Sequence, residues 1–121
     1  MKKRVLFIDN DEEITGIIQE LIKLIGYESD ISRDSYTAIK LLKSQPEGFD
    51  LVITDMNMPH MSGLELSRRL LNIRPDLPII VCIGDDQSSL KESAIDVGVK
   101  GFLSKPFSMG ELKAAVNQML T

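Results

Sequence analysis

Acidic side chains stand directly after two apolar segments of this 121-residue chain. Asp9 and Asp11 follow the first segment, and Asp55 follows the third. If these segments are neighbouring parallel strands, the three carboxylates share one edge of a sheet. Clustered carboxylates repel one another and resist burial unless a cation joins them. The pattern therefore predicts a site for a hard divalent cation such as Mg²⁺, which prefers oxygen ligands.

Lys105 follows the last apolar segment and would add a fixed positive charge to the same edge. Carboxylates, Mg²⁺ and a lysine suit a phosphoryl group, because the cations neutralise its oxygens and a carboxylate can act as nucleophile. Each residue also has an ordinary interpretation: Asp9 and Asp11 at a helix N-terminus, Asp55 in a turn, and Lys105 on a solvated surface. Their joint position after the apolar segments favours the phosphoryl site.

Five apolar segments alternate with segments of helical period. The strand candidates are Val5–Ile8, Tyr27–Ile31, Leu51–Thr54, Ile79–Ile83 and Gly101–Leu103. The helical candidates run from Ile14 to Ile25, Tyr36 to Leu42, Leu64 to Leu71, Leu90 to Val97 and Leu112 to Met119. Strict alternation predicts an α/β fold, a doubly wound parallel sheet with helices on both faces. Ligands of such sheets bind beyond the carboxyl ends of the strands, at a topological switch point.

Individual residues predict where the first helix begins and ends, and whether the single histidine is exposed. Asn10, with Glu13 three residues later, is typical of an N-terminal capping pair. Gly26 is a candidate for the residue that ends the helix. His60 follows a proline at a loop tip, so we expect it to be exposed rather than catalytic.

Composition narrows the classes of function. Hydrophobic residues make up 43% of the chain and charged residues 26%, which suits one globular domain over residues 1–121 and excludes wholesale disorder. With 14 basic and 18 acidic residues, no basic face for nucleic acid is expected. The single cysteine and single histidine exclude an intramolecular disulfide and a zinc site of the usual ligand count. No apolar run is long enough for a membrane span or a signal peptide. Because Cys82 is the only cysteine, we expect a reducing, cytoplasmic location.

Four motifs in this order and spacing resemble the receiver domain of two-component response regulators, of which the chemotaxis receiver is the single-domain example. They are the acidic turn Asp9-Asn10-Asp11, the stretch from Asp50 to Gly63, Pro78-Ile-Ile-Val, and the stretch from Gly98 to Phe107. The resemblance extends from Lys3 to about Leu120. It implies a five-stranded flavodoxin-like fold with strand order 2-1-3-4-5, and a signalling phosphoacceptor rather than an enzyme.

The resemblance also implies roles for individual residues. Asp55 matches the phosphoacceptor, which takes a phosphoryl group from a histidine kinase or phosphotransfer protein. Lys105 matches the lysine that contacts this group, and its bond to Pro106 is typically cis. Asp9, Asn10 and Asp55 match the Mg²⁺ ligands, together with the backbone carbonyl of Asn57. Phe102 matches the aromatic switch position, and Gly63 matches a turn after the phosphorylation loop.

Two residues depart from the family pattern. Asn10 stands where the second acid of the metal-binding pair is usual, so one negative charge is lost and weaker Mg²⁺ binding is expected. Ile83 stands where a threonine or serine hydroxyl normally bonds the phosphoryl group. A missing charge-assisted hydrogen bond is worth about 1.5–3 kcal/mol, so weaker switching at Phe102 is expected.

Two alternatives stay open from the sequence alone. Asn10 and Ile83 support a pseudo-receiver, a protein-interaction module of the same fold that works without phosphorylation. A haloacid-dehalogenase-type phosphohydrolase would use Asp9 as its nucleophile, but the chain has no lysine between Asp55 and Gly84, where that family needs one. The kinase, the downstream protein target and self-association as a homodimer through the last two helices are not specified by the sequence.

Overall fold

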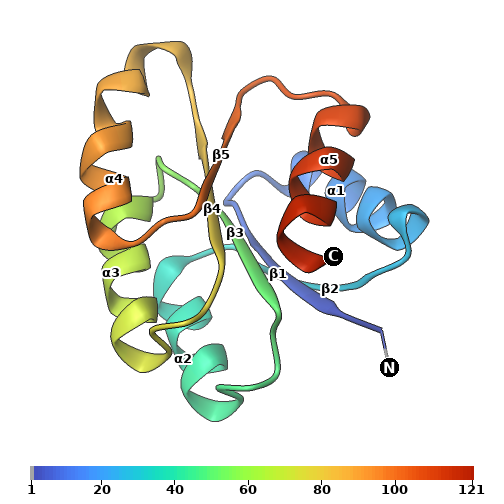
Figure 1. The fold of residues 1–121 in the computed structure, drawn as a ribbon, viewed down its shortest axis with the longest axis horizontal. Helices are drawn as coiled ribbons and strands as arrows, with labels where there is room; N and C mark the ends of the chain where they lie inside the picture. The colour runs from blue at the N-terminus through green and yellow to red at the C-terminus, as the bar shows by residue number, and fades with distance from the viewer. Residues whose placement is uncertain (1) are drawn as a thin grey trace.

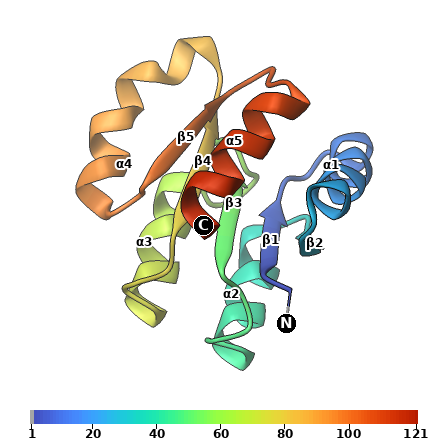
Figure 2. The same ribbon diagram turned by 45° about the vertical axis from the view of Figure 1, so that its right-hand side comes forward.

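A five-stranded parallel sheet forms the centre of the computed structural model, which describes residues 2–121. The strands lie in the order β2-β1-β3-β4-β5, visible side by side in Figure 2. Their bounds are β1 Arg4–Ile8, β2 Glu28–Ser32, β3 Leu51–Asp55, β4 Ile79–Ile83 and β5 Gly101–Ser104. The predicted α/β fold and its strand order are confirmed.

Helices cover both faces of the sheet. They are α1 Glu12–Ile25, α2 Ser35–Ser44, α3 Gly63–Ile73, α4 Lys91–Val97 and α5 Met109–Leu120, with a short 3₁₀ helix, η1 Asp85–Leu90, before α4. Figure 1 shows α2, α3 and α4 on one face and α1 and α5 on the other. No helix within residues 2–121 combines the length and apolar character that crossing a bilayer requires.

Alternation along the strands builds a separate core on each face. In β1, Leu6 and Ile8 join the cluster beneath α2, α3 and α4, while Val5 and Phe7 join the cluster beneath α1 and α5. All four side chains are at most 1% exposed. A strand buried on both faces needs this near-continuous apolar sequence. The central strands are therefore packed between two apolar cores, which fix the positions of the strand ends.

The limits of α1 are partly as predicted. Gly26 ends the helix in the left-handed conformation, with φ of 110°, and donates its N–H to the carbonyls of Ile22 and Lys23. The prediction of Asn10 as the N-terminal cap is wrong. Asp11 caps the helix instead, because its extended backbone lets the carboxylate accept the N–H groups of Glu13 and Ile14.

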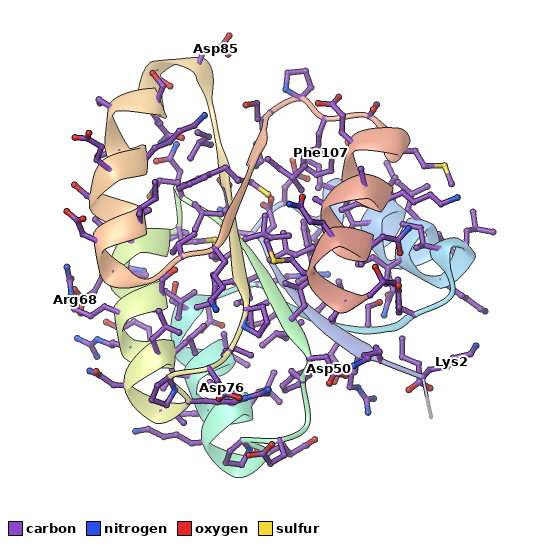
Figure 3. The ribbon with its side chains drawn as sticks, in the orientation of Figure 1. Lys2, Asp50, Arg68, Asp76, Asp85 and Phe107 are labelled. Atoms are coloured by element: carbon purple, nitrogen blue, oxygen red, sulfur yellow. The ribbon has the colours of Figure 1, made fainter. Side chains whose placement is uncertain are left out.

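All loops that follow strands gather at one edge of the sheet. In Figure 3, Lys2, Asp50 and Asp76, which precede strands, lie at the lower end of the molecule, and Asp85 and Phe107, which follow strands, lie at the upper end. The strand order reverses at β1, whose neighbours β2 and β3 are reached in opposite directions. The crevice above β1 and β3 is therefore the topological switch point of this sheet.

Gly63 packs its backbone against the end of β3. Its N–H donates to the carbonyl of Met56 at 2.8 Å. A Cβ atom at Gly63 would lie 2.4 Å from the carbonyl oxygen of Asp55 and 2.9 Å from Cα of Met56. Neither contact involves a flexible side chain, so only glycine allows α3 to begin this close to Asp55.

We predict that Gly63→Ala lowers the free energy of unfolding by roughly 1–3 kcal/mol, because the added methyl group forces the backbone of Asp55 away. Urea denaturation monitored by circular dichroism measures this change. Gly16→Ala is the matched control, since nothing lies within 4 Å of a Cβ there and alanine favours the helix by up to about 1 kcal/mol. Equal stability of the two variants would contradict the close approach.

Candidate functional site

Asp9 and Asp55 lie beside each other at the carboxyl ends of the two central strands. Ile8 pairs with Thr54 in the β1–β3 ladder, so each aspartate is the next residue beyond that pair. Asp9 is 1% exposed and Asp55 is 8% exposed. Two carboxylates are thus held side by side at the switch point, almost out of water. The predicted convergence of these two residues is found in the structure.

Lys105 supplies the opposite charge. Its Nζ lies 2.9 Å from Oδ2 of Asp55 and 3.2 Å from Oδ2 of Asp9. Its backbone N–H donates to the carbonyl of Ile83 at 2.8 Å, which extends the β4–β5 ladder by one bond and aims the side chain along the edge. The Lys105–Pro106 peptide bond is cis, as the resemblance implies. One ammonium therefore bridges two carboxylates from two other strands.

The electrostatics keep this ammonium charged. Burial by itself would lower the pKa of Lys105, but the hydrogen bond and charge of Asp55 and the charge of Asp9 outweigh burial and raise it. Cys82 lies beneath the site and behaves oppositely. Burial raises the pKa of its thiol to about 12, and the nearby aspartates add to this effect against the lowering influence of Lys105. Cys82 is therefore a neutral core residue rather than a nucleophile.

Asp11 does not join Asp9 and Asp55, although the sequence predicted that all three would converge. Its exposed carboxylate caps α1, while its backbone N–H donates to Oδ1 of Asp9 at 3.0 Å. Within residues 2–121, no group of three or more aspartate, glutamate, histidine or cysteine side chains surrounds one point. Asn10 is exposed at the same edge. The carboxylate count of the site is therefore two.

The loop between β3 and α3 is anchored by buried methionines. Met56, Met58 and Met61 are each at most 8% exposed and pack into the core beneath α2, α3 and α4. The hydroxyl of Ser35 in α2 donates to the carbonyl of Met61 at 3.1 Å. This anchoring leaves Asn57 exposed between two buried residues, at the mouth of the site.

Asn57 links the site to the segment after β4. Its N–H donates to Oδ1 of Asp55 at 3.3 Å, and its Oδ1 accepts from Nε2 of Gln87 at 2.6 Å. Oε1 of Gln87 accepts the N–H of Gly84 at 2.9 Å. Gln87 was not among the residues predicted from the sequence, where its only signal is its place four residues after the end of β4.

Ile83 and Phe102, which the resemblance assigns to the switch, lie in or beside an apolar core. Ile83 is 2% exposed and packs in the apolar core beneath α2, α3 and α4, so its side chain offers no hydrogen bond to the site. Phe102 is half-buried at the border of that core. The ammonium of Lys91, at the start of α4, lies 5.6 Å from the centre of its ring, within the range of a cation–π contact.

The oxygen donors of this edge suit a hard cation. The carboxylates of Asp9 and Asp55, the amide of Asn10 and the backbone carbonyl of Asn57 are ligand types that Mg²⁺ accepts, with water completing its coordination. Asp55 is the more exposed of the two aspartates and lies within reach of Lys105. A carboxylate beside a lysine ammonium can attack an electrophilic phosphorus while the cation stabilises the charge on the phosphoryl oxygens.

The sequence of this chain is similar to that of a known protein family. The family model for the response regulator receiver domain matches residues 5–117. The response regulator MprA of Mycolicibacterium vanbaalenii is 32% identical over 120 residues, which cover 99% of this chain and 51% of that protein. The MprA of Mycobacterium tuberculosis is 30% identical over the same length. The chain thus spans about half the length of the curated relatives it matches.

Solved structures share the whole fold. A response regulator receiver domain from Clostridium thermocellum superposes with a TM-score of 0.93 at 27% identity, covering 98% of this chain and 94% of that one. The chemotaxis protein CheY4 of Vibrio cholerae superposes with a TM-score of 0.89 at 26% identity, covering 98% and 99%. The chain belongs to the response regulator receiver family, whose members are signalling modules of two-component systems rather than enzymes in the ordinary sense.

Proposed function

We propose that Asp55 of this chain accepts a phosphoryl group from a phosphohistidine of a histidine kinase or phosphotransfer protein. An Oδ atom of Asp55 attacks the phosphorus, the P–N bond breaks, and its electron pair returns to the imidazole nitrogen of the donor. The observation that carries the proposal is the ammonium of Lys105, held between the buried carboxylates of Asp9 and Asp55. It is placed to bind the phosphoryl oxygens as charge develops on them.

Mg²⁺ is the cofactor of this proposal. Asp9, Asn10, Asp55 and the backbone carbonyl of Asn57 would hold it, and it would neutralise further charge on the phosphoryl oxygens. A receiver domain of the sensor histidine kinase PA1611 from Pseudomonas aeruginosa is described with magnesium in its active-site cleft. At 19% identity that structure supports the fold alone, so the support for Mg²⁺ here is the donor set of this chain.

An apolar groove beside the site suits the phosphodonor protein. Ile14, Ile17 and Leu21 of α1 face Phe107 across it, and Lys105 forms part of its wall. Ile17 is 60% exposed, an unusual position for an isoleucine. A protein-borne phosphohistidine that reaches Asp55 must cover the surface adjoining Lys105. We therefore place the docking face of the donor on α1 and the loop between β5 and α5, in the cytoplasm where such donors act.

The first test is the intact mass of the protein after incubation with acetyl phosphate and Mg²⁺. We expect one phosphate adduct on the wild type and none on Asp55→Asn. Asp55→Asn removes the nucleophilic carboxylate while keeping the size of the side chain. Asp50→Asn is the matched control and should label normally, because the Asp50 carboxylate accepts the N–H of Arg4 at the opposite end of the sheet.

Other outcomes separate the alternatives. If no adduct forms while a reference receiver labels normally, the chain is a pseudo-receiver that acts by protein interaction alone. If Asp55→Asn keeps the adduct, the acceptor is another residue, and Asp9 as nucleophile would indicate a phosphohydrolase. The deeper burial of Asp9, at 1% exposed against 8% for Asp55, disfavours that role.

We predict that Asn10→Asp binds Mg²⁺ about ten-fold more tightly than the wild type, since metal affinity follows the charge count of the ligands. Isothermal titration calorimetry measures the dissociation constant directly. Asp11→Asn is the matched control: it changes the net charge by one unit in the opposite direction, yet asparagine also caps a helix. We expect Asp11→Asn to change the dissociation constant for Mg²⁺ only slightly. A loss in Asp11→Asn as large as the gain in Asn10→Asp would show that overall charge, not ligation, sets the affinity.

The absence of a hydroxyl at Ile83 predicts a small response at Phe102. We expect beryllofluoride with Mg²⁺, a phosphoryl analogue, to shift the ring resonances of Phe102 less in the wild type than in Ile83→Thr. A charge-assisted bond of about 1.5–3 kcal/mol corresponds to roughly a 10- to 150-fold change in the switching equilibrium. Ile83→Val has the shape of threonine without its hydroxyl and should resemble the wild type. Full displacement of Phe102 in the wild type would refute the prediction.

A further inference from the structure

A chain of hydrogen bonds runs from Asp55 to the segment after β4. It passes from Oδ1 of Asp55 to the N–H of Asn57, from the amide oxygen of Asn57 to Nε2 of Gln87, and from Oε1 of Gln87 to the N–H of Gly84. The N–H of Gln87 also donates to the carbonyl of Gly84 at 3.0 Å. The side chain and the backbone of Gln87 thus close the first turn of η1 on Gly84.

The side chain of Gln87 bridges the loop after β3 and the segment after β4. Among residues 2–121, its contact with Asn57 is the only hydrogen bond between loop 56–62 and segment 84–90. The two residues are 30 positions apart in the sequence. The strands themselves are joined just before this point, where Met56 donates to the carbonyl of Cys82 at 2.9 Å. Beyond the strand ends, the polar connection between the two loops is the Gln87 side chain.

The orientation of the Gln87 amide follows from its neighbours. The N–H of Gly84 can only donate, so it requires the oxygen of Gln87, and the NH₂ group then faces Asn57. Because this NH₂ group is a donor, the side chain of Asn57 directs its amide oxygen toward it. Because Ile83 has no hydroxyl, no polar side chain at the end of β4 duplicates the connection. The hydrogen bonds of Asn57 and Gln87 therefore connect Asp55 to the first turn of η1.

We propose that Gln87 is a positioning residue that couples the state of Asp55 to η1, a role that rests on the proposed phosphorylation. Phosphorylation turns the Asp55 carboxylate into an acyl phosphate, whose carboxyl oxygens accept hydrogen bonds more weakly than its phosphoryl oxygens. The N–H of Asn57 then changes partner. The Asn57 side chain moves with its backbone, so its hydrogen bond to Gln87 changes. The hydrogen bond between Gln87 and the N–H of Gly84 then changes as well. The first turn of η1 thereby becomes sensitive to phosphorylation.

Hydrogen exchange tests this coupling on the intact chain. Exchange of segment 84–90 is measured by mass spectrometry with Mg²⁺ alone and with Mg²⁺ and acetyl phosphate, and intact mass gives the adduct fraction in each sample. We expect the phosphorylated wild type to change its exchange rate in this segment by about five-fold, the size of one neutral hydrogen bond. In Gln87→Leu, which keeps the bulk and loses the amide, the resting rate should rise and the response to phosphorylation should vanish.

Two further variants guard against a merely structural effect. Ser88→Ala alters an exposed neighbour in η1 that makes no side-chain hydrogen bond in this structure, and it should respond like the wild type. Asn57→Ala removes the same bond from the other loop without touching η1, and it should lose the response as Gln87→Leu does. Agreement between Gln87→Leu and Asn57→Ala would locate the effect in their contact rather than in the folding of η1.

The outcomes distinguish the coupling from the proposed function. If no variant and no wild-type sample forms an adduct, the proposed phosphorylation fails and the coupling fails with it. If adducts form but the wild-type segment does not respond, or Gln87→Leu responds like the wild type, the coupling alone is overturned. If Gln87→Leu forms no adduct while the wild type does, Gln87 acts on the phosphorylation itself, and the coupling as stated is wrong.

Discussion

The ion pair of Lys105 with Asp9 and Asp55 is the interaction on which the rest of this edge depends. Two carboxylates at the ends of adjacent strands would repel each other in a nearly dry site, and removing one partner from a buried pair is strongly destabilising. The ammonium resolves the conflict, with Nζ within 3.2 Å of both. It does so from the residue that follows β5, at sequence separations of 96 and 50 residues. The site thus exists only once β1, β3 and β5 are assembled.

The same pair limits how the edge can respond to a ligand. Two carboxylates and one ammonium leave a net charge of about −1, and Asn10 adds no further negative charge. A cation at this edge must share the carboxylates with Lys105, and a phosphoryl group must draw Lys105 toward itself. The two departures from the family pattern affect separate steps. In the proposed function, Asn10 would weaken the binding of Mg²⁺, and Ile83, buried in the core, would weaken the conformational response to phosphorylation.

The part of the site that strand ends position was accessible from the sequence. Continuous apolar strands and strict alternation dictate the sheet, and the residue after each strand must fall at one edge; Asp9, Asp55 and Lys105 are placed by this rule. Asp11 could not be assigned in this way, because its carboxylate had two uses and the backbone at the start of α1 selected the capping one. Gln87 was missed for a related reason. Its proposed role needs a 3₁₀ turn that directs its amide toward both Gly84 and Asn57. The spacing of apolar residues in the sequence does not predict such a turn.

The edge therefore has two parts with different physical bases. Strand ladders and two apolar cores fix the chemical part, so the exposed Asn10 would change the proposed affinity for Mg²⁺ without changing the geometry of Asp9, Asp55 and Lys105. Loop side chains form the responsive part, where each contact is one neutral hydrogen bond of about 1 kcal/mol. That scale suits a switch, because a contact this weak can be exchanged when one new charged group arrives at Asp55. Under the proposed function, a chain that keeps the strand ladders and cores but has Ile83 in place of a hydroxyl-bearing residue can thus retain the phosphoacceptor while it passes its signal by another contact.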